Sequence, residues 1–167
     1  MAERKHIDNI VMENARIIFR NFSGKEGKYN PPGKMNFCVI LDNDLADKLK
    51  MDGWNIKYLR PRDEDESPTP YIPVSVSYEF NPPKIYLVNS KGKNLLEESE
   101  IGMLDWAEIM NVDLIIRPYV WEVNDKSGVK AYLKSMFVTI VEDEFEKKYA
   151  DLPSMGDDAV EESPFSA

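Results

Sequence analysis

The sequence contains little cysteine and no long hydrophobic run, and each absence excludes a class of protein. Cys38 is the single cysteine, so neither an internal disulfide nor a cysteine-rich zinc site can form. No stretch of about 18 apolar residues occurs, and residues 1–8 lack the apolar segment of a signal peptide. We therefore expect a soluble, non-secreted protein in a reducing compartment, the cytoplasm, with no membrane contact.

Side chains that commonly carry catalysis are scarce as well. The only histidine, His6, stands near the N-terminus, and Cys38 falls within a strand-like segment, so no nucleophile has a base beside it. No Lys-Ser or Lys-Thr pair follows Gly33, as a phosphate-binding loop would require. We expect no catalytic residue, no cofactor and no metal site. A metal-dependent nuclease that uses the carboxylates of residues 63–66 stays open as a minor alternative.

Length and composition indicate one domain with a tail. The chain has 167 residues, of which 43% are hydrophobic and 31% are charged, as in ordinary globular proteins. After Tyr149 hydrophobic residues become rare and acidic residues prevail, so this stretch is expected to lack a fixed fold. We therefore divide the chain into a domain, residues 1–149, and a flexible acidic tail, residues 150–167.

Charge is segregated along the chain. The formal net charge of -9 at first argues against a nucleic-acid partner, because binding a polyanion requires Lys and Arg. Residues 142–167, however, hold nine carboxylates and only two lysines, and residues 63–66 are a run of four acids. Once these acidic stretches are set aside, the remaining body is slightly basic and can still present a cationic surface.

Alternation of apolar and polar residues predicts a mainly β fold. Strand-like segments cover residues 10–22, 34–42, 54–59, 71–80, 84–89, 112–123 and 129–141. Two short helices are expected, one capped by Asp42 or Asn43 and ending at Met51, the other within residues 95–110. Because strands and helices do not alternate, the pattern indicates a β-barrel or sandwich and not a doubly wound sheet.

The last two strands are predicted to form a hairpin with an aromatic and basic outward face. A loop at residues 125–128 would pair Trp121 with Tyr132, Tyr119 with Lys134 and Val123 with Lys130. Arg117 continues this face, whereas the apolar face would hold Leu114, Ile116, Val120, Ala131, Leu133 and Phe137. Bases can stack on such rings while nearby cations contact phosphates. The alternative is that these aromatic residues only stabilise the sheet as cross-strand pairs.

Two further clusters combine cations with aromatic rings. The loop of residues 23–34 contains Lys25, Lys28, Tyr29 and Lys34, and the first strand before it carries Arg16 and Arg20. The alternative for this loop is an ordinary solvated turn. A third group, Lys57, Tyr58, Arg60 and Arg62, lies next to Trp54, which we expect in the core.

The layout of these segments resembles phage-type single-stranded DNA-binding proteins with an OB-fold and an acidic C-terminal tail. The resemblance rests on the strands 15–19 and 37–41, the loop 27–30, the hairpin 116–133 and the tail 157–165. It implies an OB-fold-like, five-stranded antiparallel barrel with extra strands, whose groove binds single strands without sequence preference. Such tails commonly end at a phenylalanine, whereas Ser166 and Ala167 follow Phe165 here.

From the residues and this resemblance, we predict a non-enzymatic single-stranded DNA-binding protein of phage replication, recombination or repair in the host cytoplasm. The expected DNA contacts are Arg16, Arg20, Lys25, Lys28, Tyr29, Lys34, Arg117, Tyr119, Trp121, Lys130, Tyr132 and Lys134. Residues expected to bind partner proteins, or to compete with DNA, are Asp157, Asp158, Glu161, Glu162 and Phe165. A homodimer is left open. The alternatives are an acidic interaction module or DNA mimic, and RNA in place of DNA.

Overall fold

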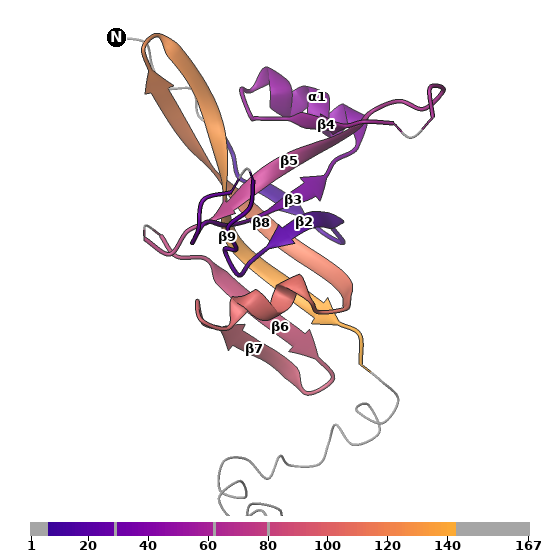
Figure 1. Cartoon of the computed structure of the whole chain (residues 1–167), viewed down its shortest axis with the longest axis vertical. Coiled ribbons are helices and arrows are strands. Elements are labelled where there is room, and N and C mark those ends of the chain that lie inside the picture. The colour runs from indigo at the N-terminus through magenta and orange to yellow at the C-terminus, as the bar shows by residue number, and fades with distance from the viewer. Residues whose placement is uncertain (1–6, 29, 62, 80, 143–167) are drawn as a thin grey trace, which may run out of the picture.

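The computed structural model of the chain describes residues 7–28, 30–61, 63–79 and 81–142, which form a mainly β structure (Figure 1). In chain order the strands are β1 (Ile10–Met12), β2 (Ile17–Asn21), β3 (Met35–Ile40), β4 (Lys57–Leu59), β5 (Thr69–Val76), β6 (Lys84–Asn89), β7 (Gly92–Leu96), β8 (Ile109–Val123) and β9 (Lys126–Ile140). Helix α1 (Asn43–Met51) follows β3, and a short 3-10 helix, η1 (Ile101–Asp105), precedes β8. The predicted mainly β class is confirmed.

The strand order is that of an OB-fold barrel. Along the sheet the strands follow one another as β1, β8, β9, β5, β3 and β2. β1 and β2 are two parts of the single strand predicted over residues 10–22, and they lie at opposite ends of this order. One segment of the chain therefore borders β8 at one end and β3 at the other, which curls the sheet into a partly open barrel.

The sheet is mixed, where the sequence predicted an antiparallel barrel, and β6 and β7 extend it beyond the barrel strands. β6 runs parallel to β9, and β7 folds back antiparallel onto β6. β9 also makes one parallel bridge to β5, between Ser75 and Tyr132. Figure 1 shows this extension at one end of the molecule and the tip of the β8–β9 hairpin at the other.

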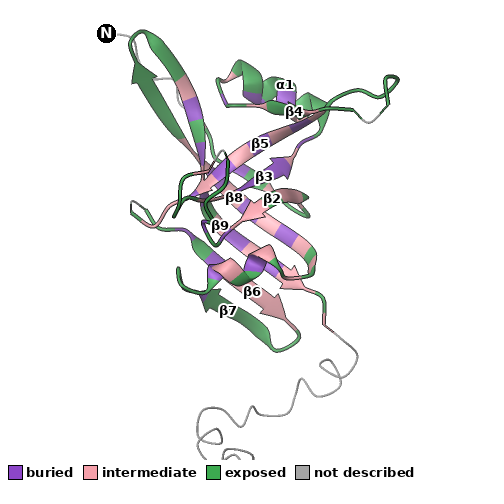
Figure 2. Ribbon diagram, in the orientation of Figure 1, coloured by how far each residue is buried: buried purple, intermediate pink, exposed green. Residues whose placement is uncertain are grey.

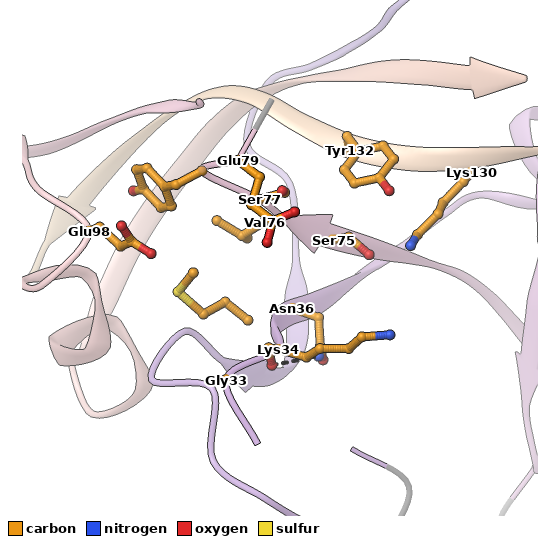
Figure 3. Close-up of a pocket in the computed structure, with 12 residues that line it drawn as sticks. Gly33, Lys34, Asn36, Ser75, Val76, Ser77, Glu79, Glu98, Lys130 and Tyr132 are labelled. Carbon is orange, nitrogen blue, oxygen red and sulfur yellow. Dashed lines mark hydrogen bonds between the residues drawn. The ribbon is translucent and has the colours of Figure 1, made fainter. Parts of the chain in front are cut away.

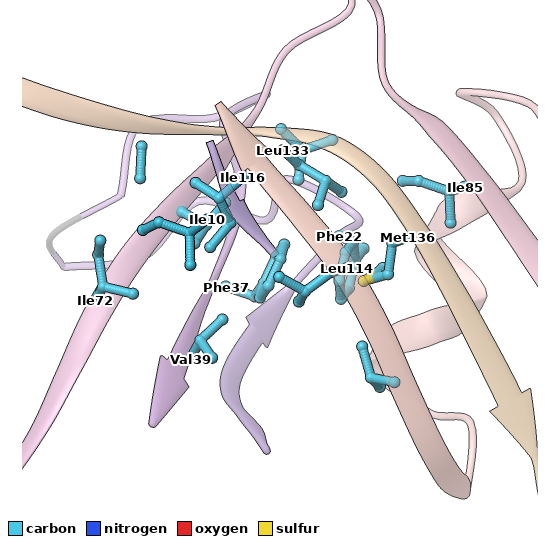
Figure 4. Packing of buried hydrophobic residues seen from close by; sticks show 14 of the residues in the cluster. Ile10, Phe22, Phe37, Val39, Ile72, Ile85, Leu114, Ile116, Leu133 and Met136 are labelled. Carbon is cyan, nitrogen blue, oxygen red and sulfur yellow. The ribbon is translucent and has the colours of Figure 1, made fainter. Parts of the chain in front are cut away.

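The core lies between the inner faces of the barrel strands (Figure 4). In β5 every second residue is buried, so that Ile72, Val74 and Val76 face inward. Figure 2 shows buried and more exposed residues alternating along β8 and β9 as well. Among the described residues no polar or charged residue is buried, so burial of apolar side chains is what stabilises the barrel.

Helix α1 begins and ends at the residues that the sequence predicted. The carboxylate of Asp42 accepts a hydrogen bond of 2.7 Å from the backbone N–H of Leu45, which caps the first turn. After the helix, Gly53 has a φ of +100°, a conformation that glycine adopts without strain. Trp54 is 3% exposed, so its predicted place in the core is confirmed. The second predicted helix is reduced to η1, because β7 extends to Leu96 and β8 begins at Ile109.

Pro73 occupies a gap between two neighbours of β5. One edge of β5 pairs with β3. The other edge pairs with β4 from Thr69 to Tyr71 and then with β9 at Ser75. Pro73 lies between these two contacts, where no partner strand needs the N–H that proline lacks. The strand accommodates this proline through an interruption in its pairing.

Candidate nucleic-acid interface

The β8–β9 hairpin has a tighter turn than the sequence predicted. Asn124 and Asp125 form a two-residue turn with positive φ angles of 49° and 66°, so the four-residue loop at 125–128 is wrong. Trp121 therefore lies opposite Gly128, and Tyr119 opposite Lys130. The true register differs from the predicted one by an even number of residues. Side chains therefore stay on their predicted faces near the tip, although their partners change.

A second irregularity changes one face assignment. The β8–β9 register shifts between Ile115 and Ile116, which leaves Lys134 without a counterpart in β8 and marks a β-bulge. Beyond the bulge Met136 and Val138 are buried, while Phe137 is only partly buried. Phe137 was predicted on the apolar face and instead lies on the face that carries Tyr132. We call this non-core face the outer face of β9.

Four of the predicted DNA contacts meet on the outer face around one ring. Arg117 lies opposite Tyr132, and its guanidinium carbon is 4.9 Å from the centre of that ring. The ammonium nitrogen of Lys130 is also 4.9 Å from the ring centre. Tyr119 approaches edge-on, with ring centres 6.0 Å apart. We call these four residues the Tyr132 cluster; it combines stacking surface with two cations.

The Tyr132 cluster borders a cavity of about 420 Å³ that also receives Lys34 (Figure 3). Lys34 comes from the loop before β3, Ser75 from β5, and Lys130 and Tyr132 from β9. Figure 3 shows the β9 side chains on one side of the cavity and Lys34 on the other. The lining residues are Gly33, Lys34, Met35, Asn36, Ser75, Val76, Ser77, Tyr78, Glu79, Glu98, Lys130 and Tyr132. We call this cavity the groove.

The two ends of the groove differ in charge. Glu79 and Glu98 also line the groove, and Figure 3 shows Glu98 at the end remote from Lys130. Burial, followed by the negative charge of Glu98, raises the pKa of the Tyr78 hydroxyl, so this group stays neutral at physiological pH. A polyanion is therefore attracted to the end that Lys34 and Lys130 border and is repelled from the other.

Hydrogen bonds within the loop 22–34 fix the position of Lys34. The side-chain amide of Asn30 donates to the carbonyl oxygens of Lys25, Pro31 and Lys34 at 2.9 to 3.1 Å. The backbone N–H of Gly33 donates to the carbonyl oxygen of Gly24 at 2.8 Å. A Cβ atom on Gly24 would lie 3.0 Å from the carbonyl carbon of Gly33, so this close approach requires glycine. These bonds hold the backbone of residues 30–34 at the edge of the groove.

Other predicted contacts from this loop lie apart from the groove. The ammonium group of Lys25 sits 4.4 Å from the ring centre of Trp106, and Trp106 is 76% exposed. Lys28 is exposed and does not line the groove. Tyr29 falls outside the described residues, as do the predicted tail contacts Asp157, Asp158, Glu161, Glu162 and Phe165. The sequence interpretation missed Trp106, because its neighbours indicated a helix and not an exposed site.

The two arginines of the first strand line another cavity. Arg16 and Arg20 both border a space of about 530 Å³ beside residues 107–112. The Nη1 atom of Arg20 donates hydrogen bonds of 2.8 Å to the carbonyl oxygens of Leu104 and Ala107. This guanidinium therefore ties β2 to the end of η1, and neither arginine joins the Tyr132 cluster.

Trp121 and Lys134 lie on opposite sides of the Tyr132 cluster. The indole of Trp121 covers Gly128, because a Cβ atom built there would be 2.7 Å from its Cζ2 atom. Trp121 is 38% exposed and extends the aromatic face toward the hairpin tip. Lys134 lines a second cavity, of about 530 Å³, together with Arg117 and Lys84. The predicted face is therefore brought together in space, with Arg117 bordering both the cluster and this cavity.

Phe19 is a further exposed ring that the sequence did not single out as a contact. It has a positive φ of 51° within the irregular β2–β3 pairing, and its ring meets that of Tyr71 edge-on at 5.8 Å. The side chain is 60% exposed. A non-glycine residue in this conformation is uncommon, and strain of this kind often marks a functional position. Only a structure reveals it, because nothing in the sequence signals the φ angle.

Neither a metal-binding group of side chains nor a membrane-spanning helix is found among the described residues. No group of three or more His, Cys, Asp and Glu side chains in that part of the chain is arranged to hold a metal ion. None of its helices is both long and apolar enough to pass through a bilayer. What the site presents is thus rings, cations and a groove.

Comparison with known proteins gives a family and a fold. The family described as "Putative phage ssDNA-binding domain" matches residues 1–166 of the chain. The single-stranded DNA-binding protein from bacteriophage Enc34, in complex with ssDNA, is similar in structure, with a TM-score of 0.52 and 15% identity over 81% of this chain and 88% of that one. Another structure of that Enc34 protein gives a TM-score of 0.51 and 16% identity over 86% and 88%. No curated protein matches in sequence.

Proposed function

The chain belongs to the family of phage single-stranded DNA-binding domains and binds single-stranded DNA, and from this premise we propose that the groove and the Tyr132 cluster are where it binds. The observation that carries the proposal is the convergence of Lys34, Lys130 and Tyr132 on one groove from distant parts of the sequence. Rings that bind bases and cations that bind phosphates are what a single strand requires.

In this mechanism rings and cations have separate tasks. Bases stack on Tyr132, Tyr119 and Trp121, each stack contributing about 1 to 3 kcal/mol. Lys34, Arg117 and Lys130 neutralise phosphates and release their counterions, so affinity falls as salt rises. Neither interaction reads a base edge, so binding has no sequence preference. Lys25, Lys28 and Lys134 supply further phosphate contacts outside the groove. Arg20 holds η1 in place instead.

The acidic tail competes with DNA for the same cations and recruits proteins of replication or recombination. Support comes from the end of the described chain, which is held at the β6–β7 turn: Ser90 donates from its backbone N–H and, at 2.7 Å, from its hydroxyl to the carboxylate of Glu142, the last described residue. The tail, residues 150–167, belongs to the same chain as the groove. Tethering gives it an effective concentration of about millimolar, so weak intrinsic affinity suffices. The protein acts without catalysis, in the cytoplasm of the host cell.

Tryptophan fluorescence during titration with oligo-dT tests the groove. Single strands of about 12 nucleotides should quench the emission at low salt, with weaker binding at higher salt and little response to duplex of the same length. Trp121→Phe tests whether Trp121 is the indole that responds. Trp54 is buried, and Trp106 lies beside Lys25, apart from the groove. Absence of any response at low salt, in the full chain and in a chain without residues 150–167, would reject the groove and favour an acidic interaction module.

Deletion of residues 150–167 tests the competition separately. The shortened protein should bind oligo-dT more tightly than the full chain, and the difference should shrink as salt rises, because screening weakens the tail and the DNA alike. Equal affinities at low salt would remove competition from the mechanism and leave the groove in place. A pull-down of replication proteins that survives the deletion would likewise exclude recruitment through the tail.

A further inference from the structure

A second pair of rings with a cation lies on β6 and β9, away from the groove. Tyr86 and Phe137 are opposite one another in the parallel β6–β9 register, and their rings stack with centres 4.7 Å apart at an angle of 13°. The ammonium nitrogen of Lys93, from β7, is 5.0 Å from the centre of the Tyr86 ring and 5.8 Å from that of Phe137. Both rings are partly exposed and Lys93 is exposed. Like the Tyr132 cluster, this trio combines two aromatic rings with a cationic side chain.

The bulge at Lys134 puts the two aromatic sites on the same face. Without the extra residue, Phe137 would follow Leu133 into the core, as strict alternation predicts. With it, Met136 and Val138 take the core positions, and Phe137 points to the side that carries Tyr132. Phe137 comes five positions after Tyr132 along β9. At about 3.3 Å per residue they lie about 16 Å apart, the length of about five stacked nucleotides.

Cations fill the interval between the two aromatic sites. The second cavity, of about 530 Å³, is lined by Arg117, Lys134 and Lys84. Arg117 also contacts the Tyr132 ring, and Lys84 stands two residues before Tyr86 on β6. Of the described residues that line this cavity, none is acidic. Asp113 lies across from Phe137 on β8, and its carboxylate accepts a hydrogen bond from the backbone N–H of Asn14. The face is thus basic, with one acid on its β8 side.

We propose that the outer face of β9 is a continuous track on which a single DNA strand continues from the groove to a second stacking site at Tyr86 and Phe137. Lys93 contacts the phosphate beside the stacked base, and Lys84, Arg117 and Lys134 contact the phosphates between. Two observations favour a DNA strand on this face: its cations complement the phosphates, and the face is continuous with the groove through Arg117 and Tyr132. The inference rests on the proposed function, since it extends the same strand beyond the groove.

Removing the track's lysines should weaken binding of long strands only. Lys84→Gln with Lys93→Gln should leave the affinity for an oligo-dT of about five nucleotides unchanged, because such a strand fits the groove. For a strand of about 15 nucleotides at 0.1 M salt, two lost phosphate contacts should lower affinity about 10- to 30-fold and reduce the salt slope by about 1.4. The matched control is Lys48→Gln with Lys91→Gln, which removes the same charge from exposed positions off the track.

Replacing a ring separates stacking from charge. Phe137→Leu keeps an apolar side chain on β9 and removes the stacking surface. It should lower the affinity for the long strand about tenfold, leave the short strand unaffected and leave the salt slope unchanged. Circular dichroism before titration confirms that the variant is folded.

Several outcomes would overturn the track. If the Lys84 and Lys93 variant loses the same affinity for short and long strands, these lysines belong to the groove site. If the Lys48 and Lys91 control loses the same affinity for the long strand, the effect is one of net charge alone. A change of oligomeric mass without a change in affinity would assign the face to a second copy of the chain. If wild type binds the short strand and gains nothing with length, the track fails while the groove stands. If wild type fails to bind even the short strand at low salt, the proposed groove itself fails.

Discussion

The two faces of β9 differ in burial and in chemistry. The inner face presents Val129, Ala131, Leu133, Met136 and Val138, all buried. The outer face presents Lys130, Tyr132, Lys134 and Phe137, all at least partly exposed. Because successive side chains of a strand point to opposite sides, one sequence builds a core and a binding surface at once. Changes on the inner face should therefore act on folding, and changes on the outer face on DNA affinity.

The inner face should give the largest effect. Leu133 is 1% exposed, and Leu133→Ala removes buried methyl groups and leaves a cavity, which costs about 2 to 5 kcal/mol of unfolding free energy. Urea denaturation measures this loss directly. Wherever the variant remains folded, its affinity for oligo-dT should match wild type. A folded variant with normal stability and weakened DNA binding would break the comparison between the faces.

Replacing Arg20 should lower folding stability and not DNA affinity, although its charge led us to predict a DNA contact. Arg20→Gln removes the charged donor that Leu104 and Ala107 share, at a cost of about 2 kcal/mol in unfolding free energy. Its affinity for oligo-dT should stay within twofold of wild type when both are folded. Arg117→Gln serves as the contrast, because that arginine stands over Tyr132 and its loss should weaken binding. Equal binding losses in the two variants would return Arg20 to the DNA interface.

Tyr132 tests the outer face. Tyr132→Leu removes one stacking ring from the groove and should cost about 1 to 3 kcal/mol of binding free energy with oligo-dT, with a smaller effect on stability. Tyr132→Phe keeps the ring and should bind nearly as wild type. Fluorescence titration of the two variants side by side measures the difference. If Tyr132→Phe binds as poorly as Tyr132→Leu, the hydroxyl and not the ring is the contact.

The faces near the hairpin tip could be predicted from sequence because face assignment depends only on parity. The predicted loop had the wrong length, yet an even shift in register left Trp121, Tyr119 and Tyr132 on one side. The bulge at Lys134 had no sequence signal, so Phe137 was assigned to the core. Contacts between distant segments could not be predicted either, because they leave no local pattern in the sequence. Examples are the position of Lys34 across the groove from Lys130 and the parallel pairing of β6 with β9.

A smaller effect on DNA affinity is expected from Gly128 of β9, whose backbone the indole of Trp121 covers. Gly128→Ala meets no φ restriction, but its Cβ atom would lie 2.7 Å from Trp121, so the indole must move. The unfolding free energy should change by less than about 1 kcal/mol, because the indole is 38% exposed and can move toward solvent. Oligo-dT affinity should fall, though by less than in Trp121→Ala, and the tryptophan emission should shift. Unchanged emission and affinity would show that Trp121 does not depend on Gly128 for its position.

Cys38, whose ionisation affects stability only at alkaline pH, marks a limit of the two-face rule. It pairs with Pro73 on the non-core side of β3, yet it is only 9% exposed, and burial raises the pKa of its thiol to about 11. In the unfolded chain the thiol ionises near pH 9, so between about pH 9 and 11 the unfolded state loses a proton that the folded state keeps. Folding stability should therefore fall as pH rises through this window, by at most about 1.4 kcal/mol per pH unit. The unfolding free energy of wild type should decline more steeply there than that of Cys38→Ala, in which every other titrating group is the same. Parallel declines would mean that the thiol is accessible to water, and that this side of β3 is as open as the outer face of β9.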